Sequence, residues 1–357
     1  MLQTKSPKMK LVEVRPFCCC NITFIYSHEP GIPSSTEESP LVGSLEQGIS
    51  RGRGIGLFVI KAIARGELVL VEKPLLLASY TQTREKILKS VKRLPPHKME
   101  QYTSLSYPRH SPRRPSQSTS DAYDDYLYSI WSINTFSCPL NKRGVYTTAS
   151  RINHSCTPNL MFSHKSDNAT MLAHTVRDIA AGEELTWSYI DVCQPSEARQ
   201  DRLNRVCPDM GVCICDTCAE DTLVSVYRKH QSDMRRARMF DLRILLSTFR
   251  ISDSNKNCEV MLRYGVELEK LLKAEGLEGM QLAACYHMMS AIRARKGPEM
   301  AVGYKKRELE VLETCFGVSN PRYSRCVSEL GHLEAGRKDH AKSSTDACVR
   351  ADDELGF

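Results

Sequence analysis

The chain has 357 residues, which is long enough for two or more folded units. Hydrophobic residues make up 41% of it and charged residues 25%, so the composition is that of a globular protein and excludes a disordered or fibrous one. The net charge is +7. No run of residues approaches the roughly 20 apolar residues that a membrane-spanning helix needs.

The 15 cysteines bear on the compartment of the protein. Residues 1–10 carry lysines but lack the apolar stretch of a secretory signal. Cysteines without such a signal favour reduced thiols and metal sites over disulfides. We therefore expect a cytoplasmic or nuclear protein that does not associate with membranes.

Residues 1–47 are expected to form an N-terminal extension, in which Leu11–Tyr26 is one possible strand. The adjacent cysteines 18–20 could form a lipidation or metal site, but neighbouring thiols lack the ligand spacing of a zinc finger. A run of thiols on a strand is the favoured interpretation.

Residues 48–206 are predicted to form a β-rich domain, because short extended runs alternate with Gly, Pro and Asn. The segments Ile63–Glu67 and Ile179–Glu183 are near-copies that each place a glycine turn before a strand. A helical, polar insert is expected over about 81–125, with a helix stopped by Pro95 and Pro96 and a serine-rich stretch behind it. The predicted strands are Leu57–Ile60, Leu68–Val71, Met171–Ala173 and Leu185–Tyr189, and the predicted apolar helix face is Ile87, Leu88, Val91 and Leu94.

The insert carries an excess of positive charge. Between Arg84 and Arg114 there are nine basic and two acidic residues, a balance of +7. Such a patch can attract nucleic acid or an acidic partner. Apart from Tyr102 and Tyr107, it lacks the interleaved aromatic residues that stack on bases. We therefore expect a solvated helix followed by a loose loop, and nucleic-acid binding is not expected.

Residues 221–357 are predicted to be helical, because strand signals vanish after Cys218 and apolar residues recur at helical spacing. Two helix pairs, near 257–296 and 299–337, repeat at an interval close to that of tetratricopeptide repeats, and a plain helical bundle is the alternative. This region is expected to serve packing or the recognition of partner proteins. The apolar positions are Met261, Tyr264, Leu268, Leu271, Leu272, Leu282, Tyr286, Met289, Ile292, Leu309, Leu312, Phe316, Val327, Leu330 and Leu333.

A cysteine cluster of the form C-x-C-x2-C lies in segment 207–220, formed by Cys213, Cys215 and Cys218. Three thiolates leave one tetrahedral position open, which zinc completes with another sulfur or an imidazole. Cys156 is the natural candidate, because it belongs to the other unusual string of the chain, Arg151–Asn159. The cysteines that remain possible alternatives are Cys138, Cys193 and Cys207.

Three further strings are informative in combination. Arg53–Phe58 holds a G-x-G, which permits a tight turn or a close approach of the backbone to a ligand. Asn153 and His154 are expensive to bury unless each donor and acceptor is satisfied, so they indicate a polar ligand or a tight loop crossing. Glu184–Asp191 places the hydroxyl of Tyr189 at the end of an apolar strand.

The order G-x-G-x-F, R-I-N-H-S-C-x-P-N, E-E-L-T-W-S-Y-I-D and C-x-C-x2-C resembles the SET-domain protein lysine methyltransferases of the SET-and-MYND type. The resemblance covers about 48–218 well and the helical tail more weakly. It implies an α+β protein with a β-rich SET domain and a knot-like core. A zinc-binding post-SET segment and an all-α, tetratricopeptide-like C-terminal domain would follow. The implied activity is methylation of lysine side chains on a protein substrate, histone or non-histone, with S-adenosylmethionine as methyl donor.

The resemblance also implies roles for individual residues. Tyr189 is expected to be the catalytic residue, its hydroxyl orienting the amine and the methyl group. The structural zinc is expected on Cys156, Cys213, Cys215 and Cys218. The residues expected to contact the cofactor are Arg53, Gly54 and Ile55, largely through their backbone, with Tyr126, Asn134, Ser150, Asn153, His154 and Tyr189.

Two departures from the family pattern stand out. The stretch 81–125 contains no cysteine, so the MYND zinc finger is expected to be missing. The family usually carries an aromatic residue before C-x-C-x2-C, but no Phe, Tyr or Trp occurs between Tyr189 and Tyr227, and only Met210 could pack on adenine there. A catalytically weak SET scaffold that binds other proteins is therefore the alternative function.

Overall fold

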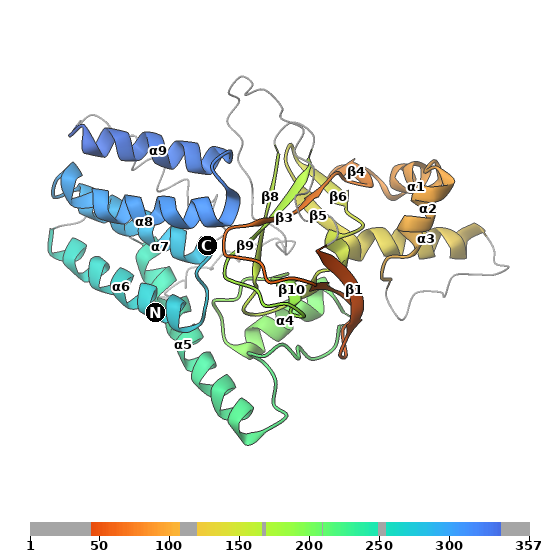
Figure 1. Cartoon of the computed structure of the whole chain (residues 1–357), viewed down its shortest axis with the longest axis horizontal. Coiled ribbons are helices and arrows are strands. Elements are labelled where there is room, and N and C mark those ends of the chain that lie inside the picture. The colour runs from red at the N-terminus through yellow and green to blue at the C-terminus, as the bar shows by residue number, and fades with distance from the viewer. Residues whose placement is uncertain (1–43, 108–119, 166–168, 209, 249–254, 337–357) are drawn as a thin grey trace, which may run out of the picture.

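A computed structural model describes residues 44–107, 120–165, 169–208, 210–248 and 255–336. The predicted strand Leu11–Tyr26 and the cysteines 18–20 lie outside these residues. Small β-sheets form the middle of the molecule, the helices α5–α9 lie on one side of them, and α1–α3 lie on the opposite side (Figure 1). The predicted α+β class, with a β-rich domain followed by a helical region, is confirmed.

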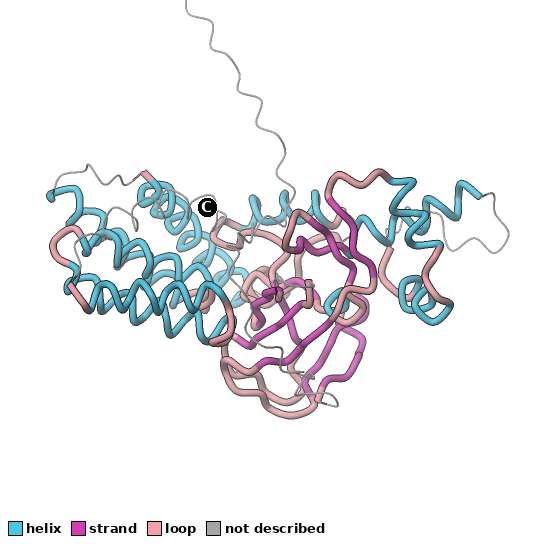
Figure 2. The backbone as a smooth tube through the Cα atoms, turned by 90° about the horizontal axis from the view of Figure 1, so that it is seen from above, coloured by secondary structure: helices cyan, strands magenta, loops and turns pink. Residues whose placement is uncertain are grey.

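The strands form three small sheets, which Figure 2 shows close together in the middle of the molecule. One sheet has the order β1-β2-β10-β7, the second β3-β9-β8 and the third β4-β6-β5. The strands are β1 (Leu45–Ser50), β2 (Gly54–Val59), β3 (Leu68–Glu72), β4 (Leu76–Ser79), β5 (Thr135–Cys138), β6 (Lys142–Val145), β7 (Asn153–His154), β8 (Leu160–His164), β9 (Met171–Thr175) and β10 (Glu184–Trp187). The 3-10 helix η1 (Ala149–Arg151) leads into β7.

All four of these strands are present; the starts at Leu68 and Met171 are as predicted, and the other ends are shifted by one to three residues. Tyr189 lies just beyond β10 and not within it. The two near-copies meet each other, since the Ile63 and Ile179 backbones exchange hydrogen bonds of 2.9 Å in both directions. The core of the sheets is a cluster of buried apolar side chains that includes Leu57, Val59 and Leu185.

The insert folds into α1 (Arg84–Lys92), α2 (Pro96–Thr103) and the first part of α3 (Ser120–Asn134). The predicted helix is confirmed, and it ends before Pro95 as expected. The expectation of a merely solvated insert was incomplete, because its helices bury a second apolar cluster around Tyr102 and Trp131. Ion pairs of Arg84 with Asp125 and of Lys92 with Asp124 tie α1 to α3 and offset part of the positive charge.

The helical region consists of α5 (Leu223–Ser247), α6 (Asn255–Ala274), α7 (Met280–Ala294), α8 (Pro298–Phe316) and α9 (Pro321–Glu334), preceded by α4 (Ser196–Val206). Each helix from α5 to α9 packs against the next, and α8 also packs on β8 and β9. Both a repeat array and a plain bundle are compatible with this order. The predicted inner face of α9 was partly wrong, because Cys326 is its buried residue and the neighbouring Val327 is exposed.

Candidate active site and cysteine cluster

The chain segment that contains β7 passes beside the end of β10, and this place is called the crossing below. The two strands are parallel, with Asn153 opposite Thr186 and His154 opposite Trp187. Asn159 fastens the crossing: its Oδ1 accepts a hydrogen bond from the Thr186 amide at 2.7 Å, and its Nδ2 donates to the Glu184 carbonyl at 2.9 Å. Asn159 is buried, and these bonds offset the cost of removing its amide from water. The predicted tight crossing is therefore present.

Near this crossing, the carboxylate of Glu184 forms polar contacts with two of the predicted cofactor residues. Its carboxylate accepts hydrogen bonds from Ser50 Oγ at 2.9 Å and Asn153 Nδ2 at 2.7 Å, and it forms an ion pair with Arg53. Asn153 Nδ2 also donates to the Ile55 carbonyl at 3.3 Å, and the Arg53 guanidinium donates to the His154 carbonyl at 3.3 Å. The structure thus brings Arg53, Ile55, Asn153 and His154 together, as the resemblance implied.

Two glycines shape this place. A Cβ on Gly56 would collide with the Glu184 carboxylate and lie 3.0 Å from Asn153 Nδ2, so only glycine permits the close approach. Gly54 has φ +80°, and a Cβ there would meet no atom within 4 Å. The backbone of β2 is therefore open at Gly54, one of the residues that the resemblance assigns to the cofactor.

His154 and Tyr189 are held as a pair. The His154 Nδ1 accepts a hydrogen bond from the Tyr189 amide at 3.1 Å, and their rings lie 5.3 Å apart. Burial lowers the pKa of His154 to about 4, so its ring is neutral near pH 7. The Tyr189 hydroxyl donates to the Ile152 carbonyl at 2.8 Å, and burial raises the pKa of Tyr189 above its usual range. Since the proton is committed to Ile152, the oxygen of Tyr189 keeps lone pairs that can accept a further hydrogen bond.

On the β10 side of this tyrosine lies the ring of Trp187, which packs in turn against two phenylalanines. Trp187 lies 6.0 Å from Tyr189 between ring centroids, and Phe162 and Phe136 lie 4.6 and 5.5 Å from Trp187. The wall is apolar, which favours an uncharged amine over an ammonium.

The remaining predicted cofactor residues precede the crossing in the chain, in α3 and η1. Ser150 Oγ donates to the Asn134 carbonyl at 3.4 Å, which links the η1 helix to the end of α3. The Asn134 amide donates to the Ile130 and Ser106 carbonyls, both at 2.7 Å. Tyr126 is buried in the apolar cluster of the insert, with its hydroxyl directed to the Thr103 carbonyl at 3.2 Å. The hydrogen bonds and ring contacts described for Tyr126 therefore belong to the insert and not to the crossing.

The four predicted metal ligands converge. The sulfurs of Cys156, Cys213, Cys215 and Cys218 lie within 4.8 Å of one another, and all four side chains are buried. Tetrahedral zinc with Zn–S bonds of about 2.3 Å separates its sulfurs by about 3.8 Å, which is close to the 3.6 Å between Cys156 and Cys218. Within the described residues, the alternatives Cys138, Cys193 and Cys207 are not members of this group. The donor set fits a structural zinc ion.

The surroundings favour the thiolate at two of the four sulfurs: hydrogen bonds among the cysteines lower the pKa of Cys215 and Cys218 and raise that of Cys156 and Cys213. Hydrogen bonding from the Cys156 thiol, followed by that from Cys213, lowers the pKa of Cys218 to about 7. The buried Arg199 of α4 donates to Cys218 Sγ at 3.3 Å, and Cys215 Sγ accepts from the Cys156 amide at 3.5 Å. Positive charge and backbone donors next to sulfur are typical of the outer shell of a metal site.

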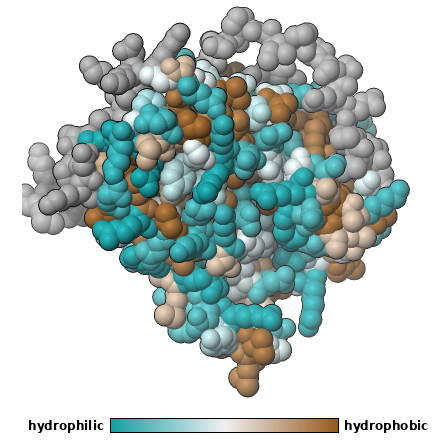
Figure 3. All heavy atoms as spheres, turned by 60° about the vertical axis from the view of Figure 1, so that its left-hand side comes forward, coloured by the Kyte–Doolittle hydropathy of each residue, from teal (hydrophilic) through white to brown (hydrophobic). Residues whose placement is uncertain are grey.

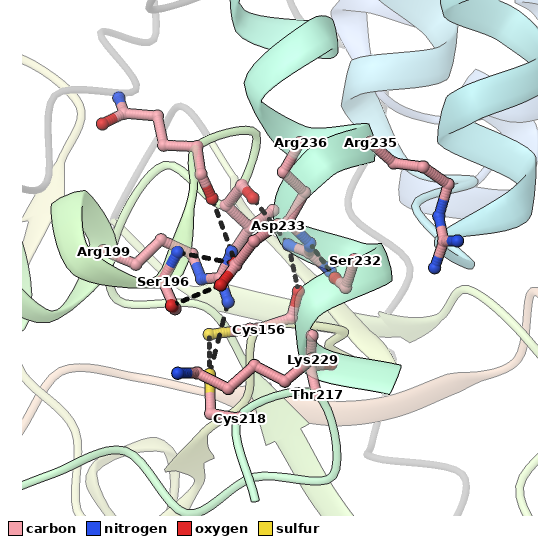
Figure 4. A network of polar contacts seen from close by, with 12 residues as sticks. Cys156, Ser196, Arg199, Thr217, Cys218, Lys229, Ser232, Asp233, Arg235 and Arg236 are labelled. Atoms are coloured by element: carbon pink, nitrogen blue, oxygen red, sulfur yellow. Dashed lines mark hydrogen bonds and ion pairs between the residues drawn. The ribbon is translucent and has the colours of Figure 1, made fainter. Parts of the chain in front are cut away.

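The sequence interpretation missed three residues, of which Arg199 and Arg236 are buried and Glu184 is half-buried. Glu184 was part of a recognised string but had no assigned role, and Arg199 and Arg236 were not singled out. Figure 4 shows Arg199 directed at Cys218, and Arg236 on α5 directed at the segment that contains Cys156. The sequence contains a signal for Arg236, because this residue lies at helical spacing from the apolar Met239 and Leu242. It therefore occupies a position on the buried face of α5 where an apolar residue is expected.

Comparison with known proteins agrees with this geometry. The family model for the SET domain matches residues 54–190. The chain is 27% identical over 205 residues to "N-lysine methyltransferase SMYD2-B" of Danio rerio, covering 54% of this chain and 44% of that protein. It is 31% identical over 122 residues to "Histone-lysine N-methyltransferase set5" of Schizosaccharomyces pombe, covering 33% and 35%.

Among solved structures, the crystal structure of the SET domain of LSMT bound to lysine and AdoHcy aligns with 86% of this chain and 91% of that one, at 13% identity and a TM-score of 0.30. The chain spans less than half the length of the two curated relatives above. Residues 54–190 form a SET domain, with SMYD-type lysine methyltransferases among the relatives of the chain.

Proposed function

We propose that this protein transfers a methyl group from S-adenosylmethionine to the side-chain amine of a lysine on a protein substrate, histone or non-histone. The observation that carries the proposal is the placement of Tyr189. Its hydroxyl is fixed by the Ile152 carbonyl, beside an apolar wall and next to the crossing of Asn153 and His154. The relatives named as lysine methyltransferases support the same reaction class.

The cofactor would supply an electrophilic methyl group on a positively charged sulfur. Arg53, Gly54 and Ile55 would bind it along the open backbone of β2, with Asn153 and His154 on the facing strand. The carboxylate of Glu184 keeps Asn153 and Arg53 in place for that contact. The neutral ring of His154 adds no positive charge to repel a cationic ligand.

The chain's own residues prepare the lysine. A free lysine has a pKa near about 10.4 and is charged in water, so it must lose one proton to solvent before its nitrogen can attack. The aromatic side chains around Trp187 disfavour the ammonium by desolvation. The Tyr189 oxygen can then accept an N–H of the neutral amine and aim its lone pair at the methyl group. Alignment of this kind supplies much of the rate.

The cysteine cluster would hold a structural zinc that keeps the post-SET segment on the domain. This segment reaches the predicted cofactor site, because a Cβ on Gly52 in the β1–β2 turn would lie 2.7 Å from Ile214 Cδ1. Ile214 thus brings an apolar side chain close to this turn, and Met210 packs against the cysteine cluster. Methyl transfer is compatible with the absence of an aromatic residue from this segment.

A catalytically weak scaffold is the second candidate. One observation favours it: α5 begins with the exposed apolar side chains of Leu223, Val224 and Tyr227. Figure 3 shows apolar atoms gathered at the lower end of the molecule, where α5 begins. Protein partners would then bind to the helical region.

A reducing compartment, cytoplasm or nucleus, is proposed with either function. No disulfide joins any of the cysteines in the described part of the chain. Among the described helices, none has both the length and the apolar character needed to cross a bilayer.

Calorimetric titration of the zinc-loaded protein with S-adenosylmethionine tests the proposal without knowledge of the substrate. Micromolar binding that is lost in Asn153→Ala supports a working cofactor site. The matched control is Asn204→Ala, since Asn204 is an exposed residue of α4. Folded protein that binds no S-adenosylmethionine would reject the enzyme in favour of the scaffold.

A further inference from the structure

Arg236 is a fully buried arginine that reaches from α5 to the backbone of the SET domain. One guanidinium nitrogen donates to the Cys156 carbonyl at 3.0 Å and to the Val192 carbonyl at 2.6 Å. The other terminal nitrogen donates to Thr157 Oγ1 at 3.2 Å. A single side chain from outside residues 54–190 therefore binds both the segment with a predicted zinc ligand and the segment that follows Tyr189.

The post-SET segment joins the same network. Thr157 Oγ1 lies 2.9 Å from Thr217 Oγ1, and Thr217 directly precedes Cys218. Figure 4 shows Arg236 and Ser232 on α5, with Cys156, Thr217 and Cys218 on the segments that α5 faces. Three segments that are distant in sequence are thus joined by one network of polar contacts that includes α5.

The charge of Arg236 is balanced within the helical region itself. Glu275, which follows α6 and is almost fully buried, accepts hydrogen bonds from Arg236 Nε at 2.7 Å and from Ser232 Oγ at 2.6 Å. It also pairs with Arg235 at 2.6 Å. A buried guanidinium is tolerated only when it is paired and its donors are satisfied. Because Glu275, directly after α6, pairs with Nε, the terminal nitrogens remain available for the SET-domain carbonyls.

We propose that Arg236 is a positioning residue for methyl transfer. It holds the strand end at Cys156 and the segment behind Tyr189 at a fixed separation, so the helical region is needed to complete the cofactor and lysine sites. This inference rests on the proposed function for its consequence in catalysis, whereas the positioning itself is a property of the fold.

Arg236→Lys is the decisive variant, because it keeps the positive charge but one ammonium cannot reproduce the planar fork that reaches two carbonyls and a hydroxyl. The matched control is Arg238→Lys on the same helix, since Arg238 pairs with Glu267 at the surface. Glu275→Gln keeps hydrogen-bond capacity at the counter-ion and removes its charge. It is expected to give the same changes as Arg236→Lys in milder form.

Three quantities are measured on the full zinc-loaded chain, well below the melting temperature of each variant: amide hydrogen exchange, zinc loss to a chelator, and the Kd for S-adenosylmethionine. In Arg236→Lys we expect faster exchange confined to residues 153–159 and 189–193. The chelator is expected to remove zinc more readily, at an affinity about 10- to 100-fold lower than in wild type, as is typical when an outer partner of a metal ligand is removed. The Kd is expected to rise about tenfold or more, because small displacements at an aligned site are costly.

The outcomes distinguish a failure of the proposed function from a failure of the positioning role of Arg236. If wild-type protein binds no S-adenosylmethionine, the proposed function fails, while hydrogen exchange and zinc loss still decide the positioning role. If Arg236→Lys behaves like Arg238→Lys in all three measurements, the inference is wrong. It is also wrong if exchange accelerates throughout the chain, including β3 and β9, because Arg236 would then be a general stabiliser. Should Arg236→Lys fail to fold, Glu275→Gln is judged by the same criteria.

Discussion

The Glu184 carboxylate and the Asn153 side-chain amide form a hydrogen bond of 2.7 Å that joins the start of β10 to β7. The carboxylate also pairs with Arg53, so it fixes two residues that the resemblance assigns to the cofactor. Glu184 therefore connects the chain's local sequence signals to one site, although it need not touch the ligand itself.

Glu184→Gln should weaken S-adenosylmethionine binding and lower the free energy of unfolding by about 1–3 kcal/mol, because Arg53 loses its partner in a half-buried place. Calorimetry and urea unfolding measure the two effects. Glu46→Gln on the exposed side of β1 is the control and should change neither. Unaltered cofactor affinity in Glu184→Gln would show that Asn153 and Arg53 are positioned without the carboxylate.

Gly56→Ala tests the close approach of β2 to Glu184. The new methyl group would press on the Glu184 carboxylate and on Asn153 Nδ2, and overpacking of this kind costs about 1–3 kcal/mol. Thermal unfolding should show the loss. Gly303→Ala on α8 meets open space and should be neutral or stabilising by up to about 1 kcal/mol, as expected for a helical glycine. Equal behaviour of the two variants would contradict the packing described for Gly56.

Tyr189→Phe should leave S-adenosylmethionine binding nearly intact and reduce turnover about 100-fold or more, the effect of deleting one preorganised polar contact in an active site. The measurement is transfer of labelled methyl from S-adenosylmethionine to a lysine-peptide array, for wild type and variant alike. Tyr227→Phe is the control, because Tyr227 is exposed on α5. Full turnover by Tyr189→Phe would remove the catalytic role from this hydroxyl.

The cysteine cluster should bind about one zinc ion per chain, which metal analysis of the purified protein can measure. Cys213→Ser should lose the metal and loosen the post-SET segment, making residues 210–218 susceptible to proteolysis. Cys207→Ser should keep the metal, because Cys207 is not in the group of four. A folded, metal-free wild type would contradict the site.

The helical region contains a buried ionic cluster whose effect depends on pH. Lys305 Nζ lies 2.7 Å from both Glu308 and Glu329, and His287 Nδ1 lies 3.0 Å from Glu308, so α7, α8 and α9 all contribute. Burial raises the pKa of Glu308, but the nearby His287 and Lys305 outweigh it and lower the pKa to about 2. A depressed carboxyl pKa means that the stabilisation is complete above about pH 4.5 and is lost as the pH falls toward about 2.

Lys305→Met should therefore destabilise the protein by about 3–5 kcal/mol near pH 7, since the buried carboxylate of Glu308 and the half-buried one of Glu329 lose their counter-ion. Its dependence of stability on pH between about 2 and 4.5 should also become flatter. Urea unfolding over this pH range measures both effects. Lys306→Met is the control, because Lys306 pairs with Glu334 at the surface and should change stability by less than about 0.5 kcal/mol. If the stability of Lys305→Met still fell steeply as the pH is lowered, the acid sensitivity would come from other groups.

Local sequence patterns predicted much of the fold and of the candidate site. Apolar runs bounded by Gly and Pro located the strands, and the i, i+3, i+4 spacing located α1 and α6–α8. The C-x-C-x2-C spacing together with the string around Cys156 anticipated the group of four sulfurs. The helix α5 was not recognised as an element, because Ser232 and Arg236 interrupt the apolar face that periodicity detects.

The sequence by itself determined which residues supply the chemistry, namely the four thiols, the tyrosine and the Asn-His pair. It also determined the alternation of strand and helix. Those properties depend on residue type and on spacing along a short stretch of chain. Only the tertiary structure decided the roles of Glu184, Arg236 and Tyr126. Their partners lie from 23 to more than 130 residues away, and which buried charge meets which distant carbonyl or carboxylate is settled by packing and by the cost of leaving a buried polar group unpaired.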